Sequence, residues 1–416
     1  MKKGRAISTT VAAVIVIIIV AAAGGAYYYS TQVTPAGHTT TQPVGSIGVV
    51  HDVGGSGDLS FNDMATLGAT RAAKAFNLNT SIVDSPTQND YVPNLEALAR
   101  KTPAPILIVG VGFLLSDAVN KTAREFPKQS FAIVDGYVPG LPNVLNVGYK
   151  ENEGSAVVGA LAAFVASCYS AKGQGSNSIG VVLGIPIPVL YKFEIGYKWG
   201  VSWAKNYSSS LGKPISNVQV LWKYTNSFTD TTLGDQTATA QFSQGAVVSY
   251  NVAGLTGKGI FTAAQRIGSS KGQTQGPPFG IGVDSDQDWI APGWIIASMM
   301  KRVDVGVYTA TQLAVNGSFN SFVQSHGGFL TLGMKEGGIA MSQLSDLATF
   351  LPLSKTPVNK TDIQNKVQNL RNKITQDCGP VYDYATNLAN LIKAGQIQVP
   401  SVTATADLNY WRSRYG

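Results

Sequence analysis

The sequence predicts an α/β protein built from two doubly wound lobes, each a mostly parallel sheet covered by helices. Helical and strand patterns alternate along the chain from residue 47 onward. Several short apolar runs, of the kind expected for strands buried on both faces, end abruptly in aspartate. The part that follows the N-terminal segments has about 370 residues, more than one hydrophobic core usually serves, so two lobes are expected.

The first lobe is predicted from the alternation of elements between residues 47 and 134. The expected elements, in order, are strand 47–50, helix 62–76, strand 81–83, helix 94–101, strand 106–109, helix 114–126 and strand 131–134. The helices have apolar residues at helical spacing, and Pro127 ends the last of them. This order of elements implies a parallel sheet with right-handed crossovers.

A second series of elements begins after Tyr149. We expect helix 153–167, strand 178–183, helix 189–207, strand 218–222, helix 232–244, strand 247–250, helix 257–267 and strand 280–283. The predicted lobes are residues 47–150 and 151–284, with about 285–322 returning to the first lobe and part of 323–416 to the second. Hinge connections are expected at 148–152 and after Asp284, and residues 330–408 are expected to wrap back over both lobes.

The N-terminus predicts a membrane anchor. Lys2, Lys3 and Arg5 precede an uncharged stretch from Ile7 to Tyr29, and about 20 apolar residues suffice to cross a bilayer. The basic end is expected in the cytoplasm, which places the rest of the chain on the extracellular face. For residues 1–29 we favour a single-pass anchor over the alternative, a cleaved signal peptide, because the apolar run is longer than usual. Prepilin-type cleavage near residues 4–6 would also leave it in place.

Residues 30–46 are rich in Ser, Thr and Pro, lack Asp, Glu, Lys and Arg, and are predicted to form an exposed stalk. A bacterial lipoprotein is not expected, since no cysteine follows the apolar run.

The two cysteines, Cys168 and Cys378, could pair outside the cell, but the sequence does not place them within bridging distance. The net charge of +7 is spread thinly over a chain with 13% charged residues, and no basic stripe predicts a nucleic-acid surface.

Three predicted strands deliver an aspartate to the same kind of sheet edge. Asp52, Asp135 and Asp284 each follow a buried strand directly or after one residue. Ligands of open α/β sheets bind beyond the carboxyl ends of the strands, so these residues predict a polar ligand held by several carboxylates. Each aspartate could instead cap a helix or form a turn.

Sequence patterns favour binding over catalysis. His38, His51 and His326 lack metal-ligand spacing, and the chain has no G-x-S-x-G motif, so neither a metal nor a cofactor is expected. The glycines of residues 54–57 do not fit a phosphate-binding loop. One enzyme class stays open as a distant alternative: a nucleoside hydrolase could use Asp52 and Asp58.

Several blocks carry a resemblance to a known family. They are DVGG at 52–55 with DLSFN at 58–62, GFLLSD at 112–117, ENEGSAVVGAL at 151–161, AGLTGKG at 253–259, the run 284–308 and the closing 392–400. In this order the chain resembles the basic membrane protein family, purine-nucleoside-binding components of ABC importers with the type I periplasmic-binding-protein fold. It departs from the family in lacking a lipobox cysteine, in Leu59, where a basic residue is usual, and in a longer C-terminal region.

The resemblance implies a nucleoside site between the lobes. Its residues would be Asp52, Phe61, Asn62, Asp135, Phe228, Gly254, Asp284 and Lys301. Phe61 and Phe228 would stack on the base. Asp135 would accept a hydrogen bond from the base, while Asp52 and Asp284 would accept from ribose hydroxyls. Lys301, which we place near a predicted helix end, would donate to the ribose, and Gly254 would let the main chain approach the ligand.

The implied function is capture of a small ligand, most simply a purine nucleoside, for an ABC permease and its ATPase subunits. Hinge closure would trap the ligand and create the form that docks on the permease. Two alternatives share the fold and the cleft: a membrane-anchored small-molecule receptor and a sugar-binding protein.

Overall fold

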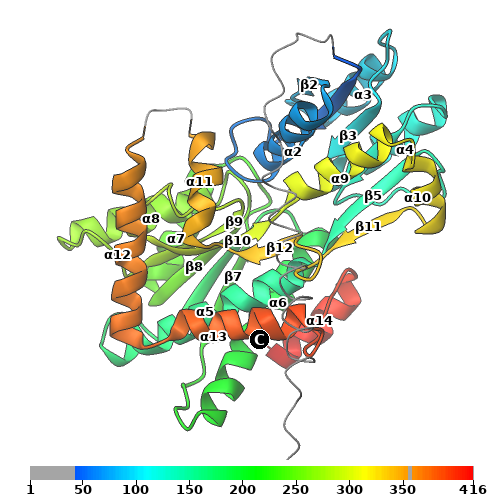
Figure 1. Ribbon diagram of the computed structural model, residues 1–416. Coiled ribbons are helices and arrows are strands. Elements are labelled where there is room, and N and C mark those ends of the chain that lie inside the picture. Colours follow the sequence, from blue (N-terminus) through cyan, green and yellow to red (C-terminus); the bar gives the residue numbers. More distant parts are fainter. Residues whose placement is uncertain (1–42, 355–357, 416) are drawn as a thin grey trace, which may run out of the picture. The chain divides into compact units, whose positions relative to one another are not determined.

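A computed structural model describes residues 43–354 and 358–415. The predicted anchor 1–29 and most of the predicted stalk 30–46 lie outside these residues. From Val44 onward the described chain forms one compact unit containing two six-stranded sheets (Figure 1). The two sheets confirm the predicted α/β class with two doubly wound lobes.

The first lobe is built on a sheet with strand order β11-β5-β4-β3-β1-β2, and all its strand pairs are parallel. The strands are β1 (Ser46–His51), β2 (Asn79–Val83), β3 (Leu107–Val111), β4 (Phe131–Val134), β5 (Val144–Tyr149) and β11 (Phe329–Leu332). The helices are α2 (Phe61–Phe76), α3 (Tyr91–Ala99), α4 (Ser116–Glu125), α9 (Val303–Val315) and α10 (Phe319–Ser325). Alternate residues of β1 face different cores: Val49 packs with Met64 of α2, and Val50 packs with Leu95 of α3.

The second lobe has strand order β12-β10-β9-β8-β6-β7, with β12 the antiparallel member. Its strands are β6 (Ser178–Leu183), β7 (Gln219–Tyr224), β8 (Ala246–Val252), β9 (Phe279–Asp284), β10 (Ile295–Lys301) and β12 (Ile339–Met341). Its first helices are α5 (Glu151–Ala171), α6 (Pro188–Ser210), α7 (Thr231–Ser243) and α8 (Lys258–Ser270). The α5–α6 pair covers one face of the sheet, and α7 and α8 cover the other (Figure 1).

Glycines let α5 and α6 pack backbone against backbone. A Cβ atom at Gly200 would lie 2.0 Å from the carbonyl oxygen of Ala156, and one at Gly196 would lie 2.4 Å from that of Asn152. Within the described residues, α5 is long and apolar enough to span a membrane, but 78% of its most apolar stretch is buried inside the protein. It is the central helix of the second lobe.

The chain passes between the sheets three times in the described residues. It leaves the first sheet at Lys150, between β5 and α5, returns at Arg302, between β10 and α9, and crosses again between β11 and β12. The chain therefore returns to the first lobe only after β10, which pairs with β9 in the second sheet. We had expected this connection directly after Asp284. Lys301 ends a strand and not a helix. Every residue of β10 is buried, and all but Ser298 and Lys301 are apolar; such a run occurs in helices and in strands.

The C-terminal helices lie on the second lobe, whereas we expected this part to wrap over both lobes. They are α11 (Leu347–Phe350), α12 (Lys360–Cys378), α13 (Val381–Lys393) and α14 (Thr405–Tyr415). Helices α12 and α13 contact α5, and α14 contacts α6. Their apolar residues join the core of that lobe, among them Leu370 and Leu388, and only β11 of the C-terminal part pairs with the first sheet.

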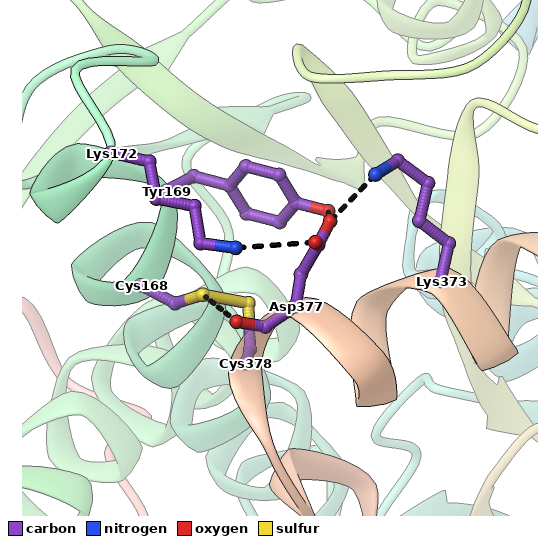
Figure 2. The surroundings of a disulfide bond; sticks show 6 residues. All are labelled: Cys168, Tyr169, Lys172, Lys373, Asp377 and Cys378. Atoms are coloured by element: carbon purple, nitrogen blue, oxygen red, sulfur yellow. Dashed lines mark hydrogen bonds and ion pairs between the residues drawn. A yellow bond between two sulfur atoms is a disulfide. The ribbon is translucent and has the colours of Figure 1, made fainter.

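A disulfide bond joins α12 to α5. Cys168 and Cys378, left unassigned by the sequence, are bonded across a sequence separation of 210 residues, with their Cα atoms 5.5 Å apart. The neighbouring Asp377 accepts hydrogen bonds from Tyr169 at 2.9 Å and Lys172 at 3.1 Å, both of α5 (Figure 2). These contacts stabilise the junction between the C-terminal helices and the rest of the lobe.

Candidate ligand-binding cleft

A cleft lies at the carboxyl ends of both sheets, and all eight sequence-predicted site residues line it. It contains about 660 Å³ of space free of protein atoms, part of it open to solvent. Asp52 follows β1, Asp135 follows β4, and Asp284 and Lys301 end β9 and β10. Phe61 and Asn62 open α2, while Phe228 and Gly254 follow β7 and β8. Parallel strands bring these residues together because their carboxyl ends share one edge.

The loop between β1 and α2 is shaped by two carboxylates. The buried Asp58 accepts hydrogen bonds from the backbone N–H groups of Ser60, Asn62 and Asp63 at 2.9, 2.9 and 3.1 Å, which caps the first turn of α2. Asp63 accepts from the N–H groups of Gly57 and Leu59 in return. Burial raises the pKa of Asp58 to about 7, and Asp63 adds to that shift.

Asp52 and Asn62 form one polar group on the first lobe. The amide of Asn62 donates to Oδ1 of Asp52 at 2.9 Å and to Asp58 at 3.2 Å, and the N–H of Gly54 also donates to Asp52. Burial raises the pKa of Asp52. Oδ1 of Asn62 is buried and has no hydrogen-bond partner among the described residues. A buried acceptor without a hydrogen bond destabilises the protein, so a ligand that donates a hydrogen bond to it would be favoured. The Asp52–Asn62 pair is therefore suited to a ligand that carries N–H groups.

Two aromatic rings reach the cleft from opposite lobes. Phe61 is the first residue of α2, and Phe228 lies in the loop between β7 and α7; both are partly buried. Glycine is required beside Phe228, because a Cβ atom at Gly184 would lie 2.1 Å from its ring. Gly254, with φ of 53°, has only Phe228 near the position of a Cβ atom, the closest atom being 3.6 Å away. Gly184 therefore leaves room for the Phe228 ring, whereas a Cβ atom at Gly254 would make only ordinary van der Waals contact with Phe228.

Asp135 and Asp284 occupy equivalent positions in the two lobes. Both have left-handed backbone conformations, with φ of 63° and 64°, which aspartate adopts more readily than most residues. The carboxylate of Asp284 accepts a hydrogen bond from the hydroxyl of Ser60 at 2.6 Å. Burial raises the pKa of Asp284 to about 6, although Lys301 and Ser60 act in the opposite direction. Oδ1 of Asp135 is buried without a hydrogen-bond partner in the described chain.

Lys301 is the one cationic side chain among the described residues that line the cleft. Its side chain is 1% exposed, and Nζ pairs with Asp135 across the cleft and lies 2.8 Å from Oε1 of Glu151. The ammonium also lies 5.2 Å from the ring centres of Phe61 and Tyr149. Burial alone would lower the pKa of Lys301, but the surrounding carboxylates raise it overall.

Sequence reasoning missed the apolar wall of the cleft. Ile187, Val189, Leu190 and Phe193, at the start of α6, line it together with Val252 and Leu255. Their position after β6 was a usable signal, because the start of a helix that follows a parallel strand lies at the ligand-binding edge. Among the described residues, no group of three or more His, Cys, Asp or Glu side chains is placed to hold a metal ion.

Residues 46–385 match a family model described as ABC transporter substrate-binding protein, PnrA-like. The chain belongs to this family. It is therefore a substrate-binding protein of an ABC transporter, and the resemblance to basic membrane proteins is confirmed. A relative named basic membrane protein D, from Borreliella burgdorferi, is 30% identical over 68% of this chain and 75% of its own length.

Two further relatives are similar to this chain in sequence. An uncharacterized lipoprotein of Pyrococcus furiosus is 36% identical over 85% of this chain and 84% of its own length. A protein of Lactococcus lactis named ABC transporter nucleoside-binding protein BmpA is 29% identical over 76% of this chain and 86% of its own length.

Solved structures agree with the fold. ABC transporter solute-binding protein from Aeropyrum pernix matches with a TM-score of 0.76 and 34% identity over 88% of this chain and 95% of that chain. An arabinose-binding protein from Geobacillus stearothermophilus matches with a TM-score of 0.54 and 15% identity over 74% of this chain. The second likeness concerns the fold alone.

Proposed function

We propose that this substrate-binding protein captures a nucleoside, with a purine base, and delivers it to an ABC permease. The observation that carries the proposal is the joint placement of two aromatic rings and two separate polar groups in one cleft. Phe61 and Phe228 suit a flat base, and base–aromatic stacking contributes about 1–3 kcal/mol per base. The name of the Lactococcus lactis relative points to the same ligand class.

The contacts favour a division of roles that differs from the one implied by the resemblance. Asp135 pairs with Lys301, so we assign Asp135, Lys301 and Asp284 together to the ribose hydroxyls. Asp52 and Asn62 form a separate group whose oxygens suit the N–H groups of a base. A neutral nucleoside offers both kinds of donor, whereas a sugar would leave the aromatic rings without a flat partner.

We also propose that the binding domain is held on the extracellular face of the membrane by the predicted anchor in residues 1–29. Relatives from three Pyrococcus species carry lipoprotein in their names, which fits a membrane-attached protein. In this chain the apolar run is not followed by a cysteine, so a helix and not a lipid would provide the attachment. Partition of the full chain into membranes, and its loss on deletion of residues 1–29, would test this.

Calorimetric titration of residues 45–416 tests the ligand class. The panel contains adenosine, guanosine, inosine, cytidine and a set of free sugars. Submicromolar binding of a purine nucleoside, with no binding of sugars, is expected. Binding of a sugar and of no nucleoside would retain the fold and reject the stacking roles of Phe61 and Phe228. Hydrolysis products in the same samples would instead favour the nucleoside hydrolase.

A further inference from the structure

Lys301 is surrounded by groups from several elements. Its ammonium faces the carboxylates of Asp135 after β4, Glu151 at the start of α5 and Asp284 at the end of β9. Tyr149 of β5 is the nearby titratable ring, and burial holds the pKa of its hydroxyl well above its usual value. Burial of this side chain, which is 1% exposed, acts to lower the pKa of Lys301, and the three carboxylates act to raise it and so favour the charged form.

The carboxylates around Lys301 belong to different lobes. Asp135 is carried by the sheet of the first lobe, whereas Lys301 and Glu151 are carried by the second. Opening of the cleft would draw Asp135 away from Lys301 and leave Glu151 in place. Asp284 also belongs to the second lobe, but its carboxylate accepts a hydrogen bond from Ser60, and among the described residues the ion pairs of Lys301 are with Asp135 and Glu151.

The two lysines beside Glu151 favour its ionised form. It is fully buried, and its two oxygens lie 2.8 Å from Lys301 and 2.6 Å from Nζ of Lys192 on α6. Burial acts to raise the pKa of Glu151, but the two lysines outweigh it and lower the pKa overall. Lys192 also donates to the carbonyl oxygen of Tyr149 at 2.9 Å, which fixes its position. Glu151 is not among the residues that line the cleft, so it acts through Lys301.

We propose that Glu151 is a positioning residue for ligand binding: it keeps the ammonium of Lys301 charged and directed into the cleft while the lobes are apart. The effect on affinity rests on the proposed nucleoside function, whereas the effect on Lys301 itself does not. Lys192 completes the arrangement by balancing the second oxygen of Glu151. An open cleft would then already present a charged donor, with no proton to be taken up when the ligand arrives.

The test compares Glu151→Gln with a matched control, Glu194→Gln. Glu194 is equally buried on the second lobe and also has two cationic partners, Lys198 and Arg412, but it does not pair with Lys301. The side-chain nitrogen signal of Lys301 is followed by NMR against pH in ligand-free protein and assigned by its absence in Lys301→Met. In Glu151→Gln its titration midpoint should fall by ~1 pH unit or more, because one opposing charge is gone. Glu194→Gln should leave it unchanged.

Affinity gives the second readout. Lysine loses its proton as pH rises, so Glu151→Gln should bind about tenfold more weakly, with the loss growing toward alkaline pH. Glu151→Asp keeps the charge and should restore most of the wild-type titration, and it replaces Glu151→Gln if that variant does not fold. An unchanged Lys301 titration in Glu151→Gln, or an equal shift in Glu194→Gln, would overturn the proposal. If wild-type protein binds no nucleoside, the proposed function fails, but the ligand-free titration still decides the role of Glu151.

Discussion

The hydroxyl of Ser60 on the first lobe donates a hydrogen bond of 2.6 Å to the carboxylate of Asp284 on the second, across 224 residues of sequence. The adjacent carbonyl oxygen of Leu59 accepts from the hydroxyl of Ser285 at 2.7 Å and from the amide of Gln287 at 3.1 Å. The loop before α2 thus contacts the end of β9 directly. Asp284, which lines the cleft, therefore also takes part in a contact between the two lobes.

Phe228→Ala should weaken nucleoside binding by tenfold or more. The substitution removes one of the two rings that would stack on the base, a contribution of about 1–3 kcal/mol. Calorimetry with the preferred nucleoside measures the change. Phe329→Ala is a suitable control, since this ring is 40% exposed on a strand of the first sheet and does not line the cleft. Unchanged affinity in Phe228→Ala would remove the ring from the site.

Asp52→Asn should change the preference among purine bases, whereas Asp284→Asn should weaken all nucleosides by a similar factor. Asp52 belongs to the group assigned to the base, and Asp284 to the group assigned to the ribose. Affinities for adenosine, inosine and guanosine, each with its 2′-deoxy form, separate the two effects. Asp135→Asn distinguishes the two divisions of roles: a change in base preference would support the role implied by the resemblance.

Nucleoside affinity should fall as pH drops below about 6 and should become less dependent on pH in Asp284→Asn. The ionised carboxylate accepts stronger hydrogen bonds from hydroxyl groups than the protonated form, and burial raises the pKa of Asp284 to about 6. The contribution of Asp284 to the stability of the folded protein changes with pH in the opposite direction. A raised pKa means that the protonated form favours the folded state, so this contribution is complete below pH 3.8 and is lost as pH rises through 6. Titrations at several pH values, with urea unfolding beside them, check both trends.

Replacing both cysteines, Cys168→Ser with Cys378→Ser, should lower the free energy of unfolding by about 2–5 kcal/mol and leave ligand affinity within about twofold. The bond closes a long loop between α5 and α12, and neither residue lines the cleft. Urea unfolding gives the stability, and calorimetry on the folded variant gives the affinity. A large loss of affinity at full folding would link α12 to the cleft.

Much of the fold could be predicted from the sequence, because buried parallel strands and their covering helices have distinct patterns. The strand Ile295–Lys301 was not predicted, because a mostly apolar run that is buried on both faces lacks the alternation of polar and apolar residues that marks a strand. The strand Val144–Tyr149 was also not predicted, although it carries the chain into the hinge. Placement of the C-terminal helices depends on long-range packing against α5 and α6, which no local pattern records.

For the cleft, sequence and resemblance supplied the polar residues that the structure brings together. They did not supply the partners of those residues. Pairing of Asp135 with Lys301 depends on how the two lobes meet, and Glu151 opens a helix on which its spacing gives no hint of a lysine from β10. Spatial neighbours of this kind come from topology and not from sequence order.

Among the described residues that line the cleft, four have carboxyl groups, Asp52, Asp58, Asp135 and Asp284, and one has a cationic side chain, Lys301. A phosphate would add up to two negative charges to this excess and would be repelled. We therefore expect adenosine monophosphate to compete with adenosine at least about a hundredfold more weakly, equal competition being the contrary result. If the proposed nucleoside function holds, a nucleotide would have to lose its phosphate to a phosphatase before this protein could bind it well.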